Sequence, residues 1–96
     1  MLRALLPLSV VRLDPLQSNI LSALYRRTER WHAVDELARK VFPDATAYED
    51  AELRGFVMPR LRRLAALGII NLRGKAVAIS LDGIDFIEKM QVRLAT

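Results

Sequence analysis

The sequence contains no cysteine and only one histidine, His32. Without cysteine the chain cannot form disulfide bonds, thiolate nucleophiles or the usual structural zinc sites, and one histidine cannot build a metal cluster or a catalytic triad. The glycine-rich phosphate loop, the Gly-x-Ser-x-Gly elbow and the His-Glu-x-x-His motif are missing too. We therefore expect no enzymatic activity, no bound metal ion and no cofactor.

Long hydrophobic runs are also lacking. The most apolar stretch, residues 1–11, is interrupted by Pro7 and is far shorter than the roughly 20 residues of a membrane span. Arg12 and Asp14 follow it without the small-residue cleavage site of a signal peptide. The sequence thus predicts a cytoplasmic protein without a membrane segment, in which residues 1–13 form an N-terminal arm or strand that contributes to a dimer contact.

The remaining chain has the composition of one folded domain, residues 14–96. Of the 96 residues in the sequence 52% are hydrophobic, which is enough for one core. Asp14-Pro15 is a strong helix start, because Asp caps the helix and Pro suits its first position, and helical apolar spacing continues to about Arg27. A second helix is predicted over residues 33–41, ended by Pro43.

An acidic segment, residues 44–52, precedes the third predicted helix. Thr46 and Glu49 have the spacing of a capping box, which predicts a helix start near residue 47. The apolar series from Leu53 to Leu64 then keeps one helical face. Because Gly55 and Pro59 are poor residues for a helix interior, we expect a break between them.

A tight hairpin and a last helix complete the prediction. Gly68 is expected to end the third helix in a left-handed conformation. Residues 69–72 and 75–79 are predicted to be strands joined by Arg73-Gly74, which would pair Leu72 with Lys75 and Ile70 with Val77. In that arrangement Ile70, Leu72, Val77 and Ile79 share a face. Ser80 is expected to cap a final helix over residues 81–94.

Two neighbouring aromatic side chains lie at the start of the second predicted helix. Trp31 is expected to pack into the core there. We expect His32 to be a surface or capping residue, with a pH-sensing role as the less favoured alternative.

The order helix, helix, helix, hairpin, helix resembles the winged-helix family, with the detailed match over residues 57–86. Val57, Leu61, Leu64, Gly68, Ile69 and Ile70 resemble the apolar pattern of the recognition helix and wing in MarR- and PadR-type regulators. The Ser80-Leu81-Asp82-Gly83 step resembles the Thr-x-x-Gly that opens the helix after the wing, and residues 34–38 resemble the usual second helix. The resemblance implies a mainly α fold with a small β-hairpin: a winged helix-turn-helix with a three-helix core, a wing and a C-terminal helix.

Positive charge is concentrated on the predicted third helix and hairpin. Between Leu53 and Leu81 the chain has six basic residues and no acidic one. At 100° per residue, Arg62 and Arg63 point away from the core side of helix 57–67, and Arg60 lies at its edge. Such a stripe suits DNA, because phosphate contacts supply much of the affinity, although a basic solvated helix face is the simpler alternative. The candidate DNA-binding residues are Arg54, Arg60, Arg62, Arg63, Arg73 and Lys75.

These features together favour a small prokaryotic or archaeal transcription regulator. We expect it to bind double-stranded DNA as a homodimer, reading the major groove with helix 57–67 and contacting the backbone with the 69–79 wing. One alternative is a winged-helix module that binds protein, which the acidic segment would favour, and another is a sequence-nonspecific chromatin or viral DNA-binding protein. The candidate dimer residues are Leu5, Leu8, Val10, Ile87, Met90 and Leu94.

Overall fold

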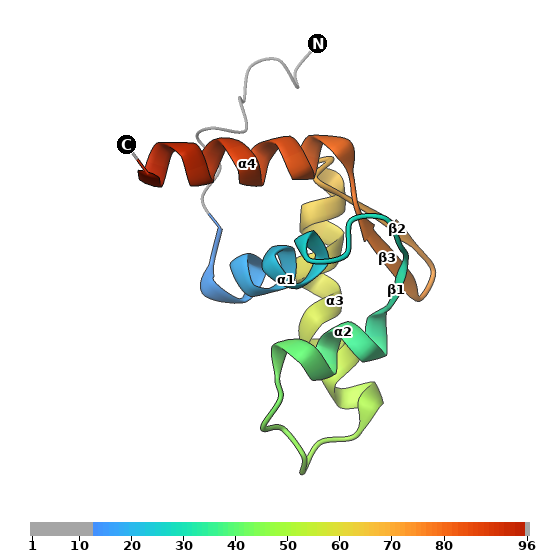
Figure 1. Cartoon of the computed structure of the whole chain (residues 1–96). Coiled ribbons are helices and arrows are strands. Elements are labelled where there is room, and N and C mark those ends of the chain that lie inside the picture. The colour runs from blue at the N-terminus through green and yellow to red at the C-terminus, as the bar shows by residue number, and fades with distance from the viewer. Residues whose placement is uncertain (1–12, 96) are drawn as a thin grey trace.

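The computed structural model describes residues 13–95, and the side chains of residues 13–90. Within this part of the chain, four helices pack together and a three-stranded antiparallel sheet lies at one side of them (Figure 1). The predicted class, mainly α with a small β-hairpin, is confirmed at this level. In chain order the elements are α1 Pro15–Tyr25, β1 His32–Ala33, α2 Val34–Val41, α3 Asp50–Ala66, β2 Ile70–Arg73, β3 Ala76–Ile79 and α4 Leu81–Ala95.

Helix α1 begins where its capping signal predicts. The Asp14 side chain accepts a hydrogen bond from the Gln17 amide at 2.7 Å, and the Gln17 side chain accepts one from the Asp14 amide at 3.0 Å. Pro15 occupies the first turn, where its missing N–H costs nothing. The apolar side of α1 buries Ile20, Leu21 and Leu24 in the core.

Helix α3 is continuous from Asp50 to Ala66, so the predicted break between Gly55 and Pro59 is wrong. Its buried positions, Leu53, Val57, Leu61 and Leu64, lie on both sides of the expected break, and their burial holds the helix in one piece. Proline has no N–H, so Pro59 cannot donate the helical hydrogen bond to the Gly55 carbonyl. Because both residues are exposed, this carbonyl can accept a hydrogen bond from water instead.

The start of α3 also differs from the prediction. The capping box is formed by Glu49 and Glu52, not by Thr46 and Glu49, so the helix begins at Asp50 instead of near residue 47. The Glu49 amide donates to the Glu52 carboxylate at 3.0 Å. The residues from Pro43 to Tyr48 form a turn-rich loop before it.

The sheet contains one strand that the sequence did not predict. Its order is β1-β3-β2, because the two-residue strand β1 pairs His32 with Val77 and Ala33 with Ala76. As the alternation requires, His32 shares the inner side of the sheet with Val77 and is buried. The expectation that His32 lies at the surface is therefore wrong.

Trp31, one residue earlier, is 46% exposed, so the expectation that it packs into the core is also wrong. His32 fills that role: its Nε2 lies 3.2 Å from the Arg27 carbonyl oxygen, which links the α1–β1 connection to the sheet. Nδ1 of His32 is buried and has no partner within the described residues.

The β2–β3 hairpin has a different register from the predicted one: its loop lies one residue later in the chain, so each β2 residue pairs with a residue two positions later. Ile70 pairs with Ile79, Leu72 with Val77 and Arg73 with Ala76, so the two-residue loop is Gly74-Lys75 and not Arg73-Gly74. Gly74 has a positive φ of 58° at the first loop position, the place where a type II′ turn needs glycine. The prediction that Ile70, Leu72, Val77 and Ile79 share a face survives, because the shift moves each partner by two residues.

A cluster of hydrogen bonds fixes α4 against the end of α3. Gly68 ends α3 with a φ of 81°, as predicted. Ser80 donates from Oγ to the Gly68 carbonyl at 2.7 Å and accepts from the Gly83 amide at 2.9 Å, so it caps α4 as expected. A side chain at Gly83 would collide with the Ile69 carbonyl oxygen, which explains the glycine.

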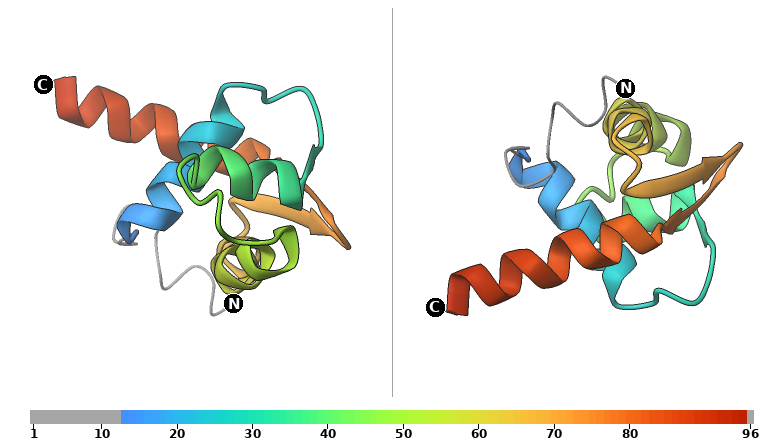
Figure 2. Two further views of the ribbon diagram at one scale, coloured as in Figure 1. Left: turned by 90° about the horizontal axis from the view of Figure 1, so that it is seen from below. Right: turned by 90° about the horizontal axis from the view of Figure 1, so that it is seen from above.

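The far half of α4 extends past α1 and the rest of the helical core (Figure 2). None of the helices in residues 13–95 combines the length and the apolar character needed to cross a membrane.

Candidate nucleic-acid interface

Helix α3 and the β2–β3 hairpin are neighbours at one edge of the molecule. The views along the perpendicular direction show α3 nearly end-on with the hairpin projecting beside it (Figure 2). The order of elements places them together, because α3 leads through Gly68 directly into β2. Side chains on the outer side of α3 and at the hairpin tip are therefore available to one extended ligand.

The second half of α3 presents cations to solvent. Arg62 and Arg63 are exposed, opposite the buried Val57, Leu61 and Leu64, as the helical spacing predicts. Neither arginine forms an ion pair with a carboxylate of residues 13–90. Their guanidinium groups are thus free to bind a phosphate or a base edge.

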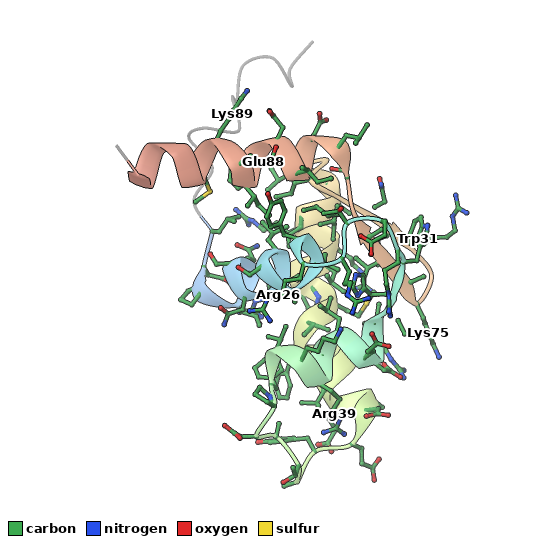
Figure 3. All side chains as sticks on the ribbon, viewed as in Figure 1. Arg26, Trp31, Arg39, Lys75, Glu88 and Lys89 are labelled. Carbon is green, nitrogen blue, oxygen red and sulfur yellow. The ribbon has the colours of Figure 1, made fainter. Side chains whose placement is uncertain are left out.

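Two more exposed cations lie at the tip of the hairpin. Arg73 is the last residue of β2, and Lys75 is the second loop residue. The Arg73 guanidinium carbon lies 5.5 Å from the centre of the Trp31 ring, a cation–π contact that orients the side chain. Figure 3 shows Trp31 and Lys75 on the same side of the molecule, at the sheet. The predicted hairpin indicated from the sequence that Arg73 and Lys75 would be exposed. Nothing in the sequence indicated the contact between Arg73 and Trp31.

Arg54, a further candidate, is held inside the protein's own structure. Its Nε and Nη2 donate to the two carboxylate oxygens of Asp35 at 2.7 and 2.8 Å, which ties α3 to α2. This bidentate bond lowers the pKa of the Asp35 carboxyl and raises that of Arg54. Arg54 is therefore committed to Asp35 and not available as a free contact.

Arg60 is only loosely engaged. Its Nε lies 3.6 Å from Oδ2 of Asp14, the residue that caps α1, and both side chains are partly exposed. An ion pair of this length between exposed groups is weak, so a phosphate could compete with Asp14 for the guanidinium. The structure thus brings Arg60, Arg62 and Arg63 together on α3, adds Arg73 and Lys75 from the hairpin, and sets Arg54 apart.

The first half of α3 has a different character. Its exposed side carries Glu52 and Phe56 and has no cation, because Arg54 faces Asp35. The acidic segment is partly neutralised by Arg39, which donates to Asp50 at 3.0 Å. Within residues 13–90, no group of three or more histidines or carboxylates has the arrangement of a metal site.

The proposed dimer residues fall into two groups. Leu5, Leu8 and Val10 and the side chain of Leu94 lie outside the described residues. Ile87 packs against the core and Met90 is 40% exposed. Both line a largely apolar hollow of about 160 Å³ between α1 and α4, together with Leu13, Leu21 and Phe86.

Neither a scan against protein-family models nor searches of the curated proteins and of the solved structures gave a match.

Proposed function

We propose that the chain is a winged-helix protein that binds double-stranded DNA, with α3 as the recognition helix and the β2–β3 hairpin as the wing. The order of helices and strands and the resemblance over residues 57–86 support this fold. The proposal makes the protein a small transcription regulator in a cytoplasmic setting.

One observation carries the proposal: the four cations Arg62, Arg63, Arg73 and Lys75 are exposed on adjoining elements and are not paired with any described carboxylate. Most other basic side chains of residues 13–90 do have such partners, for example Arg30 with Glu36 and Lys89 with Asp85. Unpaired cations release counterions from DNA without first breaking a protein ion pair, so they contribute more to binding.

The location of the cations supports the second half of α3 as the part that faces the DNA. Arg62 and Arg63 lie in its second half, while Glu52 on the first half would repel phosphate. We therefore place the major-groove contact at helix 57–67 and assign Arg62 and Arg63 to it. Arg73 and Lys75 would contact the backbone, and Arg60 would leave Asp14 for a phosphate.

Selection from a pool of random DNA duplexes tests this function. Several rounds of binding and amplification should recover duplexes that share a short motif, and a palindromic repeat of that motif is expected for a homodimer. Retention of duplexes without a shared motif would instead indicate a sequence-nonspecific DNA-binding protein. If no duplex is retained at low salt, the DNA-binding proposal fails and the chain is better explained as a protein-interaction module.

We further propose that the protein is a homodimer, with contacts around α4. The apolar hollow beside Ile87 and Met90 and the extension of α4 past the core support this arrangement. Sedimentation at micromolar concentration should give twice the monomer mass of 10.9 kDa. A stable monomer under those conditions would refute the dimer.

A further inference from the structure

An aromatic cluster lies on the surface at the end of the molecule opposite α4. Phe42 follows α2, Tyr48 belongs to the loop, and Phe56 lies on the first half of α3. The ring centres of Phe42 and Phe56 are 6.2 Å apart and those of Tyr48 and Phe56 are 5.9 Å apart, both with edge-to-face geometry. Tyr48 and Phe56 are nonetheless 45% and 48% exposed. Half of the six aromatic residues in the chain thus form this cluster, in which Phe42 packs against the core whereas the rings of Tyr48 and Phe56 remain about half exposed.

Arg39 holds the loop that carries this cluster. Its guanidinium donates to the Ala45 carbonyl at 2.8 Å and to the Tyr48 carbonyl at 2.7 Å, besides its bond to Asp50. Figure 3 shows Arg39 within the curve of the chain between α2 and α3. The position of Tyr48 against Phe56 is therefore fixed before any ligand binds, which lowers the entropic cost of binding.

The surroundings of the cluster are acidic. Asp44, Glu49 and Glu52 are exposed and form no ion pair within residues 13–90. Arg39, which hydrogen-bonds to the loop, is already paired with Asp50. A shallow hollow of about 380 Å³, lined by residues 41–45, adjoins Phe42 and could receive an aliphatic side chain. We call the three aromatic residues Phe42, Tyr48 and Phe56, together with the carboxylates of Asp44, Glu49 and Glu52, the acidic aromatic surface.

We propose that the acidic aromatic surface binds a basic segment of a partner protein that contains both aliphatic and arginine or lysine side chains. Cations of the segment would lie over the exposed rings of Tyr48 and Phe56, where the ring faces attract positive charge, and near the carboxylates of Glu49 and Glu52. An aliphatic side chain would occupy the hollow beside Phe42. Charge complementarity selects this occupant, because DNA and acidic proteins are repelled by the same carboxylates. The inference does not depend on DNA binding by the other half of α3.

A library of random 12-residue peptides displayed on phage provides the probe. Selection on the immobilised full chain should enrich peptides that combine arginine or lysine with aliphatic residues. The best peptide, synthesised with a fluorescent label, is then titrated with the wild-type protein and with the variants by fluorescence anisotropy. Selected peptides without an excess of basic residues would overturn the proposal.

Two sets of variants separate the contributions of the rings and the charges. The double variant Tyr48→Ser/Phe56→Ser should weaken peptide binding at least tenfold. The variant Asp44→Asn/Glu52→Gln should weaken peptide binding about threefold and reduce the salt dependence of binding. This variant keeps the cap of α3, because Gln also serves at the capping-box position of Glu52. The matched control Glu29→Gln/Asp82→Asn removes two exposed carboxylates elsewhere and should leave binding within a factor of 1.5.

Three outcomes would contradict the proposal, provided that circular dichroism shows each variant to be folded. The first is that the control weakens binding as much as Asp44→Asn/Glu52→Gln does. The second is that the wild-type chain self-associates in sedimentation and Tyr48→Ser/Phe56→Ser abolishes the association; the occupant is then a second copy. The third is that duplex DNA binding falls in Tyr48→Ser/Phe56→Ser as much as peptide binding does, which would make the surface part of the DNA interface.

Discussion

The same substitution, glycine to alanine, should have opposite effects at two helical positions. At Gly55 in α3, an added Cβ meets no atom within 4 Å, and the residue is exposed. Alanine is favoured over glycine in a helix interior by about 1 kcal/mol. Gly55→Ala should therefore stabilise the protein by about that amount, which corresponds to a rise in melting temperature of roughly 4–8 °C for a domain of this size.

At Gly83, in the first turn of α4, there is no space for an added Cβ. An added Cβ would collide with the Ile69 carbonyl oxygen and lie 2.9 Å from Cγ1 of Ile79. Backbone cannot move aside as a side chain does, so α4 must shift and strain the Ser80 hydrogen bonds. Overpacking of this kind costs about 1–3 kcal/mol, so Gly83→Ala should lower the melting temperature by roughly 4–24 °C.

Thermal unfolding followed by circular dichroism at 222 nm, with urea titration as a second measure, compares the two variants with wild type. Equal destabilisation by both substitutions would refute a continuous, solvent-facing α3 at Gly55. A stable Gly83→Ala variant would refute the close contact between α4 and the start of β2.

Three further predictions follow from the same structure. Pro59→Ala should stabilise α3 by about 1–3 kcal/mol in urea titration, because Pro59 interrupts a helix that continues past it; no gain would mean that the helix is not continuous there. Asp35→Asn should lower the free energy of unfolding by about 0.5–1 kcal/mol at pH 7. Because the bond from Arg54 lowers the Asp35 pKa, this stabilisation is present above the ordinary carboxyl pKa and is lost as the pH falls through the lowered pKa. The difference between Asp35→Asn and wild type in urea titrations should thus vanish in strong acid, and a constant difference from pH 7 to 2 would contradict the pairing. Arg73→Ala/Lys75→Ala should weaken duplex binding for all sequences alike and reduce the salt slope by about 1–2, with little change in melting temperature; unchanged affinity would exclude the hairpin from the interface.

Local signals made much of the fold predictable from the sequence. The Asp14-Pro15 cap, the glycine at position 68 and the serine at position 80 mark helix ends through contacts within a few residues, and the structure has these ends as predicted. The exposure of Arg62 and Arg63 followed from helical periodicity alone.

The predictions for Trp31, His32 and Pro59 failed because of interactions between residues distant in the chain. The strand β1 exists only because residues 32–33 pair with residues 76–77, and that pairing buries His32 and leaves Trp31 exposed. Core burial on both sides of Pro59 overrides its low helix propensity. Such effects cannot be read from a window of neighbouring residues.

The candidate site was predicted unevenly for the same reason. Arg54 is withdrawn by Asp35, 19 residues earlier, which the local charge count could not show. The acidic aromatic surface was missed because Phe42, Tyr48 and Phe56 come from three elements. Their concentration within 15 residues of a chain with six aromatics was the available signal.

The central claim is that the basic half of α3 binds DNA, and the salt dependence of duplex binding tests it most directly. Affinity for a labelled duplex from the selected pool is measured by fluorescence anisotropy at several salt concentrations. The comparison uses wild type, Arg62→Ala/Arg63→Ala, and the control Arg26→Ala/Arg27→Ala, which removes two exposed arginines from the end of α1 and the turn after it. We predict that Arg62→Ala/Arg63→Ala lowers affinity at least tenfold and the salt slope by up to about 2, at about 0.9 per phosphate contact, whereas the control changes affinity less than threefold. Equal losses in both variants, or an unchanged affinity in folded Arg62→Ala/Arg63→Ala, would contradict the claim.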